Sequence, residues 1–331
     1  MLNSNEANST SYPQFREHFY YLAHVILIFV VAISAVISNL VFLIAVFRNS
    51  VVYRVRDPPV SLLVVNLGLG DLLAAVVLGC GGIYYYISLL NGRAREDLHE
   101  ARIVISTFGV ITCIVSICMI SAMSVERFHA ISSPLRHRAR FTNLRIKEFL
   151  AFSWIYAISF ACLSLAVSYR VFVLLYCHIH VTLPLIILPV VYWKTYTALR
   201  FHNRNTVGNL ADLSVARRDP SICIRRNSER KLLSTILLVV VLFYVTFMPF
   251  YVALNISAHR PSLLEKKRFE IFLSLSSTIV FVNCVFDPFI YAWKIPKYRR
   301  AFKEVFGRCR CCRRLNTVRT VRDMVMEDLD N

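Results

Sequence analysis

Charged residues are scarce in this chain of 331 residues: they make up 18% of it, with 20 Asp and Glu against 38 Lys and Arg. The sequence also lacks the amphipathic helices and alternating strands with which a soluble domain of this length covers its cores. A disordered chain is excluded, because 13% of the residues are aromatic. The chain instead contains long runs that are apolar all round, which are typical of helices that cross a membrane.

Seven such runs are present, and a helix that spans a bilayer needs about 20 mostly apolar residues. They cover residues 20–47, 60–90, 103–125, 149–169, 171–198, 232–257 and 269–293. The fourth and fifth runs are separated by little more than Arg170, so they predict two helices joined by a very tight turn. The sequence therefore predicts an all-α membrane protein, with a seven-transmembrane helix bundle over residues 20–293.

Lys and Arg outside the runs are concentrated in alternate segments, namely those after the first, third, fifth and seventh runs. The positive-inside rule places these segments in the cytoplasm. We therefore expect a multi-pass protein of the plasma membrane, with an extracellular N-terminus over residues 1–19 and a cytoplasmic tail over residues 308–331. The basic face suits anionic membrane lipids or an acidic protein partner. Nucleic acid is a poor fit, because the charge flanks membrane helices.

No cysteine falls in a predicted outer loop, so no external disulfide is expected among the 10 cysteines. Cys309, Cys311 and Cys312 cluster among arginines beyond the last run. Cysteines in that position suit palmitoylation, with unmodified thiols or a metal site as the alternatives. Asn8 begins an Asn-Ser-Thr sequon on the predicted outer side, which is either a glycosylation site or a chance match.

The segment after the seventh run is amphipathic over residues 294–307. Tyr298, Phe302 and Phe306 recur four residues apart, with basic residues between them. This spacing predicts a short eighth helix that lies on the inner membrane surface.

Polar residues inside the runs are costly to bury in lipid, so each is a functional candidate. The most costly are the carboxyl groups of Asp71 and Asp287, and Glu126-Arg127 closes the third run. The remaining polar candidates are Asn39, Asn66, Ser116 and Asn283. Several such residues in one chain predict a shared polar pocket in the core of the bundle.

The order of the motifs resembles that of the rhodopsin-like (class A) G-protein-coupled receptors, from about residue 25 to about residue 312. Each run contributes one motif. They are Asn39 in Ser-Asn-Leu-Val, Asn66-Leu67 before Asp71, Glu126-Arg127-Phe128 with Ser133-Pro134-Leu135, Trp154, Pro184 with Tyr192, Phe243 with Pro249, and Asp287-Pro288-Phe289-Ile290-Tyr291.

The resemblance implies a latch at the cytoplasmic ends of the third and sixth helices. Arg127 matches the arginine that is latched in the inactive receptor and meets the G protein in the active one. Glu126 can pair with it locally, and Glu229 falls where the second latch acid of the family lies. The alternative is that Glu229 is only one charge in a basic loop.

The resemblance also implies a set of residues that repack on activation. Pro184, Ile117 and Phe243 match a packing triad. Pro249 kinks the sixth helix, because proline removes a backbone hydrogen bond. Phe247 takes the place of the family's usual toggle tryptophan, with a smaller ring that lacks the indole N–H. Two tyrosines match a pair that bridges through water, Tyr192 and Tyr291.

A sodium pocket is the third implied site, and no other cofactor is expected. Its residues would be Asp71, Ser116, Asn283, Asp287 and Asn39. Two carboxylates close together disfavour double ionisation. Either a bound Na⁺ or a shared proton would relieve the repulsion.

The outer halves of the helices are expected to line a ligand pocket. By register its residues are Gly109, Val110, Cys113, Tyr176, Cys177, His180, Phe250, Tyr251, Leu254, Ser277 and Phe281. Gly109 stands where amine receptors carry an aspartate, and no acidic residue is expected in the outer halves of the helices. A lipid, a hydrophobic peptide end or a small neutral molecule is therefore favoured over an amine. His180 is either a ligand contact or a structural hydrogen-bonding group.

Two departures from the family pattern narrow the resemblance. Arg102 stands where the family has the cysteine of its outer disulfide, and the loop between the fourth and fifth helices is almost absent. Both features resemble the melanocortin, cannabinoid and lysolipid receptor group. The acidic residues with which melanocortin receptors bind a basic peptide are missing, since those places resemble Gly81, Arg102 and Ser106.

The resemblance implies a receptor that transduces an extracellular ligand signal to a heterotrimeric G protein, and not an enzyme. An arrestin, a receptor kinase and membrane lipids are the other expected partners. The basic residues expected to contact the G protein are Arg136, Arg138, Arg140 and Arg200. The alternatives are a non-coupling or constitutively active orphan receptor and a transporter, although neither paired repeats nor broken helices are visible.

Overall fold

The computed structural model describes the backbone of residues 4–48, 58–208, 220–264, 266–294 and 298–299. Side chains are described for residues 17–48, 60–133, 135–137, 139–200, 234, 237–264, 266–293 and 298–299. The helices are α1 (Ser4–Arg48), α3 (Pro58–Leu90), α4 (His99–Ser132), α5 (Pro134–Arg140), α6 (Asn143–Cys162), α7 (Tyr169–Cys177), α8 (Leu183–Gly208), α10 (Pro220–His259), α11 (Lys267–Phe281) and α12 (Asn283–Lys294).

Within the described residues, 7 helical segments are long and apolar enough to cross a membrane. They are Glu17–Arg48, Val60–Leu90, Glu96–Ser132, Asn143–Leu165, Tyr169–Arg200, Leu237–His259 and Lys267–Trp293. The predicted all-α membrane fold with seven spans is confirmed. Most of the helices extend beyond the apolar runs, because helical hydrogen bonding continues through the polar residues at their ends.

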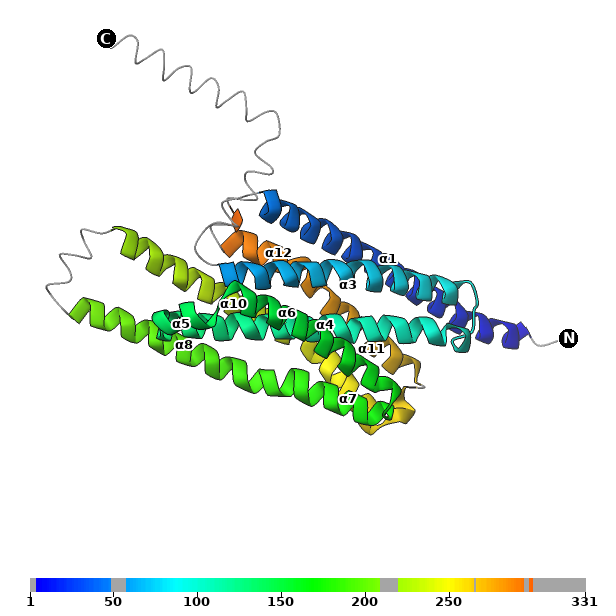
Figure 1. The fold of residues 1–331 in the computed structure, drawn as a ribbon. Helices are drawn as coiled ribbons and strands as arrows, with labels where there is room; N and C mark the ends of the chain where they lie inside the picture. The colour runs from blue at the N-terminus through cyan, green and yellow to red at the C-terminus, as the bar shows by residue number, and fades with distance from the viewer. Residues whose placement is uncertain (1–3, 49–57, 209–219, 265, 295–297, 300–331) are drawn as a thin grey trace, which may run out of the picture.

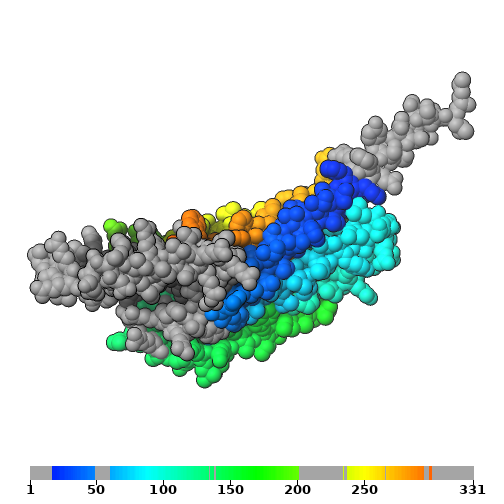
Figure 2. Space-filling view, turned by 90° about the horizontal axis from the view of Figure 1, so that it is seen from above, coloured from blue at the N-terminus to red at the C-terminus, as the bar shows by residue number. Residues whose placement is uncertain are grey.

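The long helices lie side by side along one axis of the molecule (Figure 1). α4 is the central helix, and it packs against α3, α6, α8 and α10. α1 packs against α3 and α12, and in Figure 2 it crosses the molecule as the blue helix beside α3 in cyan. We call the end at which α1 begins the N-terminal end of the bundle, and the end at which α12 stops the C-terminal end.

The outer surface of the bundle is apolar, and many polar side chains point inward. Phe152 and Ile155 on α6 are both 64% exposed, whereas Asn39 and Glu126 are fully buried. In lipid this arrangement is favourable, because the bilayer solvates the apolar face while the interior pairs the polar groups. It is the pattern expected of a membrane bundle.

Small residues let α1 and α3 approach each other closely. A Cβ atom placed on Gly79 would lie 2.6 Å from the Cβ of Ala32. Helix packing in membranes relies on such small residues, since lipid provides no hydrophobic driving force between helices. Gly79 therefore sets the distance between the first two spans.

The tight turn between the fourth and fifth spans is confirmed, with a shift in its position. A 3₁₀ turn over Leu163–Leu165 ends the fourth span, and α7 begins at Tyr169. Arg170, expected to mark the break, lies in the first turn of α7. A π-helical turn over His178–Thr182 then joins α7 to α8.

Several predictions fall outside the described residues. These are the palmitoylation of Cys309, Cys311 and Cys312 and most of the eighth helix, of which only Tyr298 and Arg299 are described. Tyr298 is fully buried, with its ring 5.5 Å from that of Phe42. The side chain of Asn8 lies outside the described part of α1 as well.

Candidate functional site

A network of charged side chains closes the C-terminal end of α4. Arg127 donates from Nε to Oε2 of Glu126 at 2.5 Å and from Nη2 to Oε1 at 2.8 Å. The pair is almost completely buried, with Glu126 at 0% and Arg127 at 4% exposure. A buried bidentate pair of this kind holds the guanidinium in one orientation.

His137 joins the same network from the short helix α5. Its Nε2 atom lies 2.7 Å from Oε1 of Glu126, so one carboxylate is held from two helices. The ring of His137 also stacks on Phe141, with centroids 5.1 Å apart. His137 could not be identified from the sequence, because helical periodicity does not predict how α5 packs against α4. Pro134, which begins α5, is the sequence signal that the chain turns there.

The latch acid predicted on the sixth helix cannot be placed against this network. Glu229 lies within the backbone range of α10, but its side chain is outside the described residues. Its role as a latch therefore stays a prediction.

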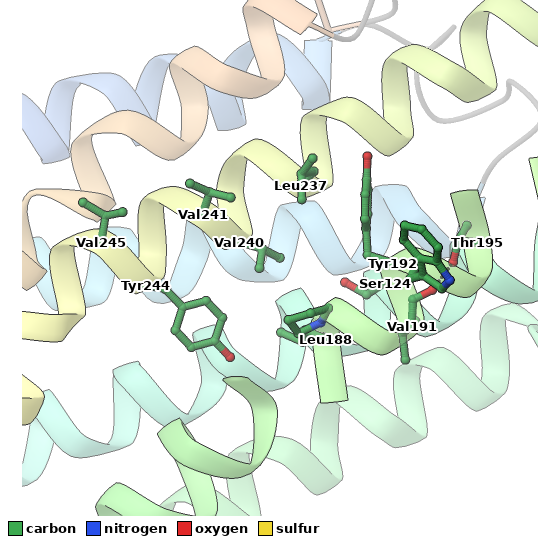
Figure 3. Close-up of a pocket in the computed structure, with 12 residues that line it drawn as sticks. Ser124, Leu188, Val191, Tyr192, Thr195, Leu237, Val240, Val241, Tyr244 and Val245 are labelled. Carbon is green, nitrogen blue, oxygen red and sulfur yellow. Dashed lines mark hydrogen bonds between the residues drawn. The ribbon is translucent and has the colours of Figure 1, made fainter. Parts of the chain in front are cut away.

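The two tyrosines matched to the water bridge lie on different helices and have different neighbours. The hydroxyl of Tyr291, on α12, is 3.9 Å from the sulfur of Met123. Tyr192, on α8, instead lines a cavity against Leu237 and Val240 of α10 (Figure 3). The structure records no contact between the two tyrosines.

A row of stacked aromatic side chains runs along α10 on both sides of Pro249. Phe247 is fully buried and stacks on Phe243, with centroids 5.3 Å apart and an angle of 15° between the rings. Phe250 meets Phe247 edge to face at 5.7 Å, and Tyr176 of α7 lies 6.4 Å from the same ring. Aromatic contacts of this kind stabilise a pair by about 0.5–1.5 kcal/mol beyond burial.

Two members of the predicted packing triad belong to the same core. Ile117 and Phe243 are buried at 6% and 8% exposure in one hydrophobic cluster. Pro184 is half-buried and stands directly after the π-helical turn at the start of α8. A π turn inserts one extra residue, so it sets which side chains of the fifth span point inward.

The carboxyl groups of Asp71 and Asp287 meet in the middle of the bundle. Their exposed fractions are 3% and 7%, and each lies against the other and against Cys284. Asn39 of α1 donates to the backbone oxygen of Cys284 at 2.7 Å, which ties α1 to α12. Two touching carboxyl groups in an apolar interior require a shared cation or a shared proton.

Three oxygen atoms around this pair lack a hydrogen-bonding partner among the described residues. They are Oδ1 of Asn39, Oδ2 of Asp71 and Oδ1 of Asn283. The amide nitrogen of Asn283 donates to Oγ1 of Thr246 on α10 at 2.5 Å, and Ser116 of α4 is half-buried. Carboxylate and amide oxygens are the ligands of a hard cation, so the donor set fits Na⁺.

Asn66 and Trp154 join α3 to α6. The indole Nε1 of Trp154 donates to Oδ1 of Asn66 at 3.1 Å. Asn66 is buried at 8% exposure, so the bond satisfies an acceptor that water cannot reach. Both motif residues thus have a structural role between two helices.

Part of the predicted ligand pocket gathers around Tyr176. This tyrosine is buried at 3% exposure and lies close to Cys113 of α4. Cys177 is fully buried and lies close to Asn255 of α10. Val110, Phe250, Tyr251 and Leu254 pack against the same hydrophobic core.

His180 points toward α6. Its Nε2 atom lies 2.9 Å from the hydroxyl of Tyr156, and its ring meets Phe160 edge to face at 4.5 Å. Of the two readings of His180, these contacts correspond to the structural one. Tyr251 has a partner as well, since its hydroxyl lies 2.9 Å from Oγ1 of Thr182 in the π-helical turn.

Three other predicted pocket residues lie apart from Tyr176. Ser277 is exposed and donates to the backbone of Ser274. Phe281 packs with Ala32 and Ala75 between α1 and α3. A Cβ on Gly109 would meet Leu78 of α3 at 3.9 Å.

A polar cluster at the N-terminal end of the bundle was not identified from the sequence. His24 of α1 is 2% exposed, and its Nε2 atom lies 3.0 Å from Oγ of Ser274 on α11. Tyr86 of α3 shares a hydrogen bond with the same serine and lies with its ring 4.4 Å from that of His24. The residues come from three helices that only tertiary packing brings together, so no sequence spacing reveals them.

An ion-pair network surrounds this cluster. Arg95 is 2.6 Å from Glu270 of α11 and donates to Tyr21 of α1 at 3.1 Å, and Lys267 also pairs with Glu270. Burial acts against the charge of Arg95, yet the Tyr21 hydroxyl and the Glu270 carboxylate raise the pKa of the guanidinium. The expectation of no acidic residue in the outer halves of the spans is wrong at Glu270, which lies in the first turn of α11 within the span Lys267–Trp293. Its charge is matched by two cations.

The architecture is that of a multi-pass membrane protein with a buried polar core, and comparison with known proteins defines its family. The model of the 7 transmembrane receptor (rhodopsin family) matches residues 38–291. The chain therefore belongs to the rhodopsin family of seven-transmembrane receptors, a family of G-protein-coupled signalling receptors and not of enzymes.

Two individual proteins illustrate the likeness. Human (Homo sapiens) melanocortin receptor 5 is 24% identical over 286 residues, which covers 85% of this chain and 82% of that protein. The crystal structure of squid rhodopsin superposes with a TM-score of 0.68 at 16% identity, over 89% of this chain and 87% of that one. The second match concerns the fold alone.

Proposed function

We propose that this receptor carries a signal from a ligand at the N-terminal end of the bundle to a heterotrimeric G protein at the C-terminal end. The observation that supports this most directly is the Glu126–Arg127–His137 network. Because Glu126 holds the guanidinium of Arg127 inside the bundle, a G protein can contact Arg127 only when this network opens. Activation is then a shift of population between a latched and an open bundle.

The proposed orientation puts the C-terminal end in the cytoplasm of a cell whose plasma membrane carries the receptor. It rests on the positions of Lys and Arg around the spans. Arg136, Arg140 and Arg200 are exposed at that end, where they supply positive charge to an acidic surface of a G protein. An arrestin and a receptor kinase would use the same end.

The proposed ligand is uncharged or lipid-like. The side chains around Tyr176 are mainly aromatic, aliphatic or thiol groups, and Glu270, an acid near the start of the last span, is paired with Arg95 and Lys267. A buried cation would lack a counter-charge there, which makes an amine ligand unfavourable. We do not extend melanocortin binding from the human relative to this chain. An acidic side chain for a basic peptide would be needed at Gly81, and a Cβ there would lie only 2.8 Å from Ile105.

A sodium ion between Asp71 and Asp287 is the second part of the proposal. Asn39 and Asn283 would complete its ligands with the amide oxygens that otherwise lack partners. The ion would neutralise two buried carboxylates, and its departure would loosen the contact between α3 and α12. The competing arrangement is one proton shared by the two carboxyl groups.

The test of coupling is G-protein dissociation in cells that express the chain, measured with a panel of G proteins against lipid, peptide and neutral small-molecule libraries. Arg127→Ala is the decisive variant, and Arg93→Ala at the opposite end is its control, because Arg93 is exposed and its guanidinium donates to Tyr84, far from Arg127. A basal or ligand-evoked signal that Arg127→Ala abolishes and Arg93→Ala retains supports coupling. A receptor at the cell surface that stays silent with every G protein and ligand would identify a non-coupling receptor.

A further inference from the structure

His24 of α1 is a buried histidine that the proposed function does not use. It lies toward the N-terminal end of the bundle, where α1, α3 and α11 meet, and only 2% of it is exposed. Nε2 of its imidazole lies 3.0 Å from Oγ of Ser274 and 3.3 Å from Oγ1 of Thr278, one turn further along α11. The ring is thus held against the last span by two hydroxyl groups, neither of which is charged.

The second ring nitrogen of His24, Nδ1, has no hydrogen-bonding partner among the described residues. The rings of Tyr86 and Tyr20 lie beside the imidazole, with centroids 4.4 Å and 5.6 Å away, and neither supplies a negative charge. A neutral imidazole has one N–H donor, whereas an imidazolium has two. The neutral form therefore fits this site, because the charged form would bury an N–H donor that has no acceptor.

The charged groups around the cluster are already balanced. Lys267 pairs with both Glu17 of α1 and Glu270 of α11. Arg95 pairs with Glu270 as well. Two cations thus match two acids, and a proton on His24 would add a fifth charge that has no counter-charge. The titratable groups that surround His24 are Glu17, Tyr20 and Tyr21 on α1, Tyr85 and Tyr86 on α3, Arg95 before α4, and Lys267 and Glu270 on α11.

A proton on His24 would therefore favour a rearranged form in which the ring leaves Ser274 and reaches water. The rearranged form binds one proton more than the present one, so the contact between α1 and α11 becomes less stable as the pH falls. The loss begins below about pH 6.5, the ordinary pKa of a histidine side chain. Below that value, each pH unit raises the ratio of the rearranged to the present form by up to about tenfold.

The contact at Ser274 is linked to the polar core of the bundle. α11 and α12 belong to one span, Lys267–Trp293, so a change at Ser274 acts on the segment that carries Asp287. α1 is tied to this span at a second level, where Asn39 donates to the backbone oxygen of Cys284. Loss of the outer contact leaves the inner one as the point about which α1 and the last span separate.

We propose that His24 is a proton-binding site, and that acid at the N-terminal end of the bundle releases α1 from α11 and favours the open bundle. The latch around Arg127 is closed in the present arrangement, so destabilising this arrangement shifts the population away from it. The signalling half of the proposal rests on the proposed function and orientation, which place His24 on the extracellular side. The binding half concerns only the contact between α1 and α11.

The binding half is tested by the midpoint of thermal unfolding of the full chain in phosphatidylcholine nanodiscs, at about pH 7.5 and about pH 5.5. His24→Gln places an amide near the position of Nε2 and cannot take up a proton, and His24→Asn is a second such variant in case the longer side chain does not fit. His18→Gln is the matched control, because His18 is exposed on the same helix. We expect acid to lower the midpoint of the wild type and of His18→Gln by a few degrees more than that of the His24 variants. An equal fall in all of these proteins would overturn the proton site.

The signalling half is tested by basal G-protein dissociation in cells, with the extracellular pH lowered from about 7.5 to about 5.5. We expect a severalfold rise in the wild type and in His18→Gln, and no rise in His24→Gln. A rise that persists in His24→Gln would overturn the signalling half, because the sensor would then lie elsewhere. A chain that signals through no G protein at either pH would overturn the proposed function and the signalling half together, and the unfolding midpoints would still decide the proton site.

Discussion

Nε2 of His137 lies 2.7 Å from Oε1 of Glu126, and this contact attaches the short helix α5 to the buried ion pair of α4. Glu126 thus has two partners, one adjacent in the sequence and one eleven residues on. Whatever moves α5 also changes how firmly Glu126 holds Arg127. A G protein that engages α5 would therefore act on the latch directly.

The first prediction is that His137→Ala raises basal G-protein activation. Hydrogen bonds to charged groups contribute about 1.5–3 kcal/mol, so losing this one should shift the balance toward the open bundle by about tenfold. The measurement is ligand-free G-protein dissociation at matched surface expression. His99→Ala, at the opposite end, is the control, and an unchanged basal signal in His137→Ala would separate α5 from the latch.

The second prediction concerns the row of stacked aromatic side chains on α10. Phe247→Ala leaves a cavity beside Phe243 and should lower the free energy of unfolding by about 3–5 kcal/mol, whereas Phe247→Leu keeps most of the volume and should cost less. The readout is the midpoint of thermal unfolding of the solubilised receptor. Phe152→Ala, at a lipid-facing position with 64% exposure, should change it little. Equal losses in Phe247→Ala and Phe152→Ala would contradict the packing argument.

The positions of the spans could be predicted from the sequence because membrane insertion depends on apolar length, which is a property of the sequence alone. The contact of Asp71 with Asp287 was anticipated for a related reason, since two carboxyl groups within apolar runs must both face the interior. Glu270 stands within the seventh apolar run and was overlooked there, and its pairing with Arg95 could not be predicted because that pairing depends on a loop whose path the sequence does not indicate.

The contacts that escaped prediction are those made by irregular segments and by helix approach. His137 reaches Glu126 only because the chain folds back at Pro134, and His24 reaches Ser274 only because α1 packs beside α12, which follows α11 in the same span. Neither contact follows from helical periodicity. The cavity between α8 and α10 likewise depends on how these two helices pack, which no single apolar run of the sequence indicates.

The third prediction is that Trp154→Phe destabilises the bundle. The substitution keeps the aromatic ring and leaves Oδ1 of Asn66 buried without its donor, at a cost of about 1–3 kcal/mol. We expect a lower midpoint of thermal unfolding in detergent. Trp193→Phe is the comparison at a lipid-exposed site, with Trp193 at 67% exposure, and a Trp154→Phe variant as stable as wild type would mean that another donor replaces the indole.

The last prediction separates a sodium ion from a shared proton in the polar core. If Na⁺ occupies the site, replacing choline chloride with NaCl should stabilise the receptor, by about 1.4 kcal/mol at a concentration ten times the dissociation constant. Asp71→Asn should remove this dependence, because it deletes one of the two carboxylates that the ion neutralises. Ser276→Ala is a control on α11, since that serine is buried but bonds only to the backbone of Phe272. A shared proton predicts a different result: stability would be indifferent to Na⁺ and would fall as the pH rises, because deprotonation would leave two carboxylates in contact. Thermal unfolding measured as a function of both Na⁺ concentration and pH therefore decides whether a sodium ion or a shared proton holds Asp71 and Asp287 together.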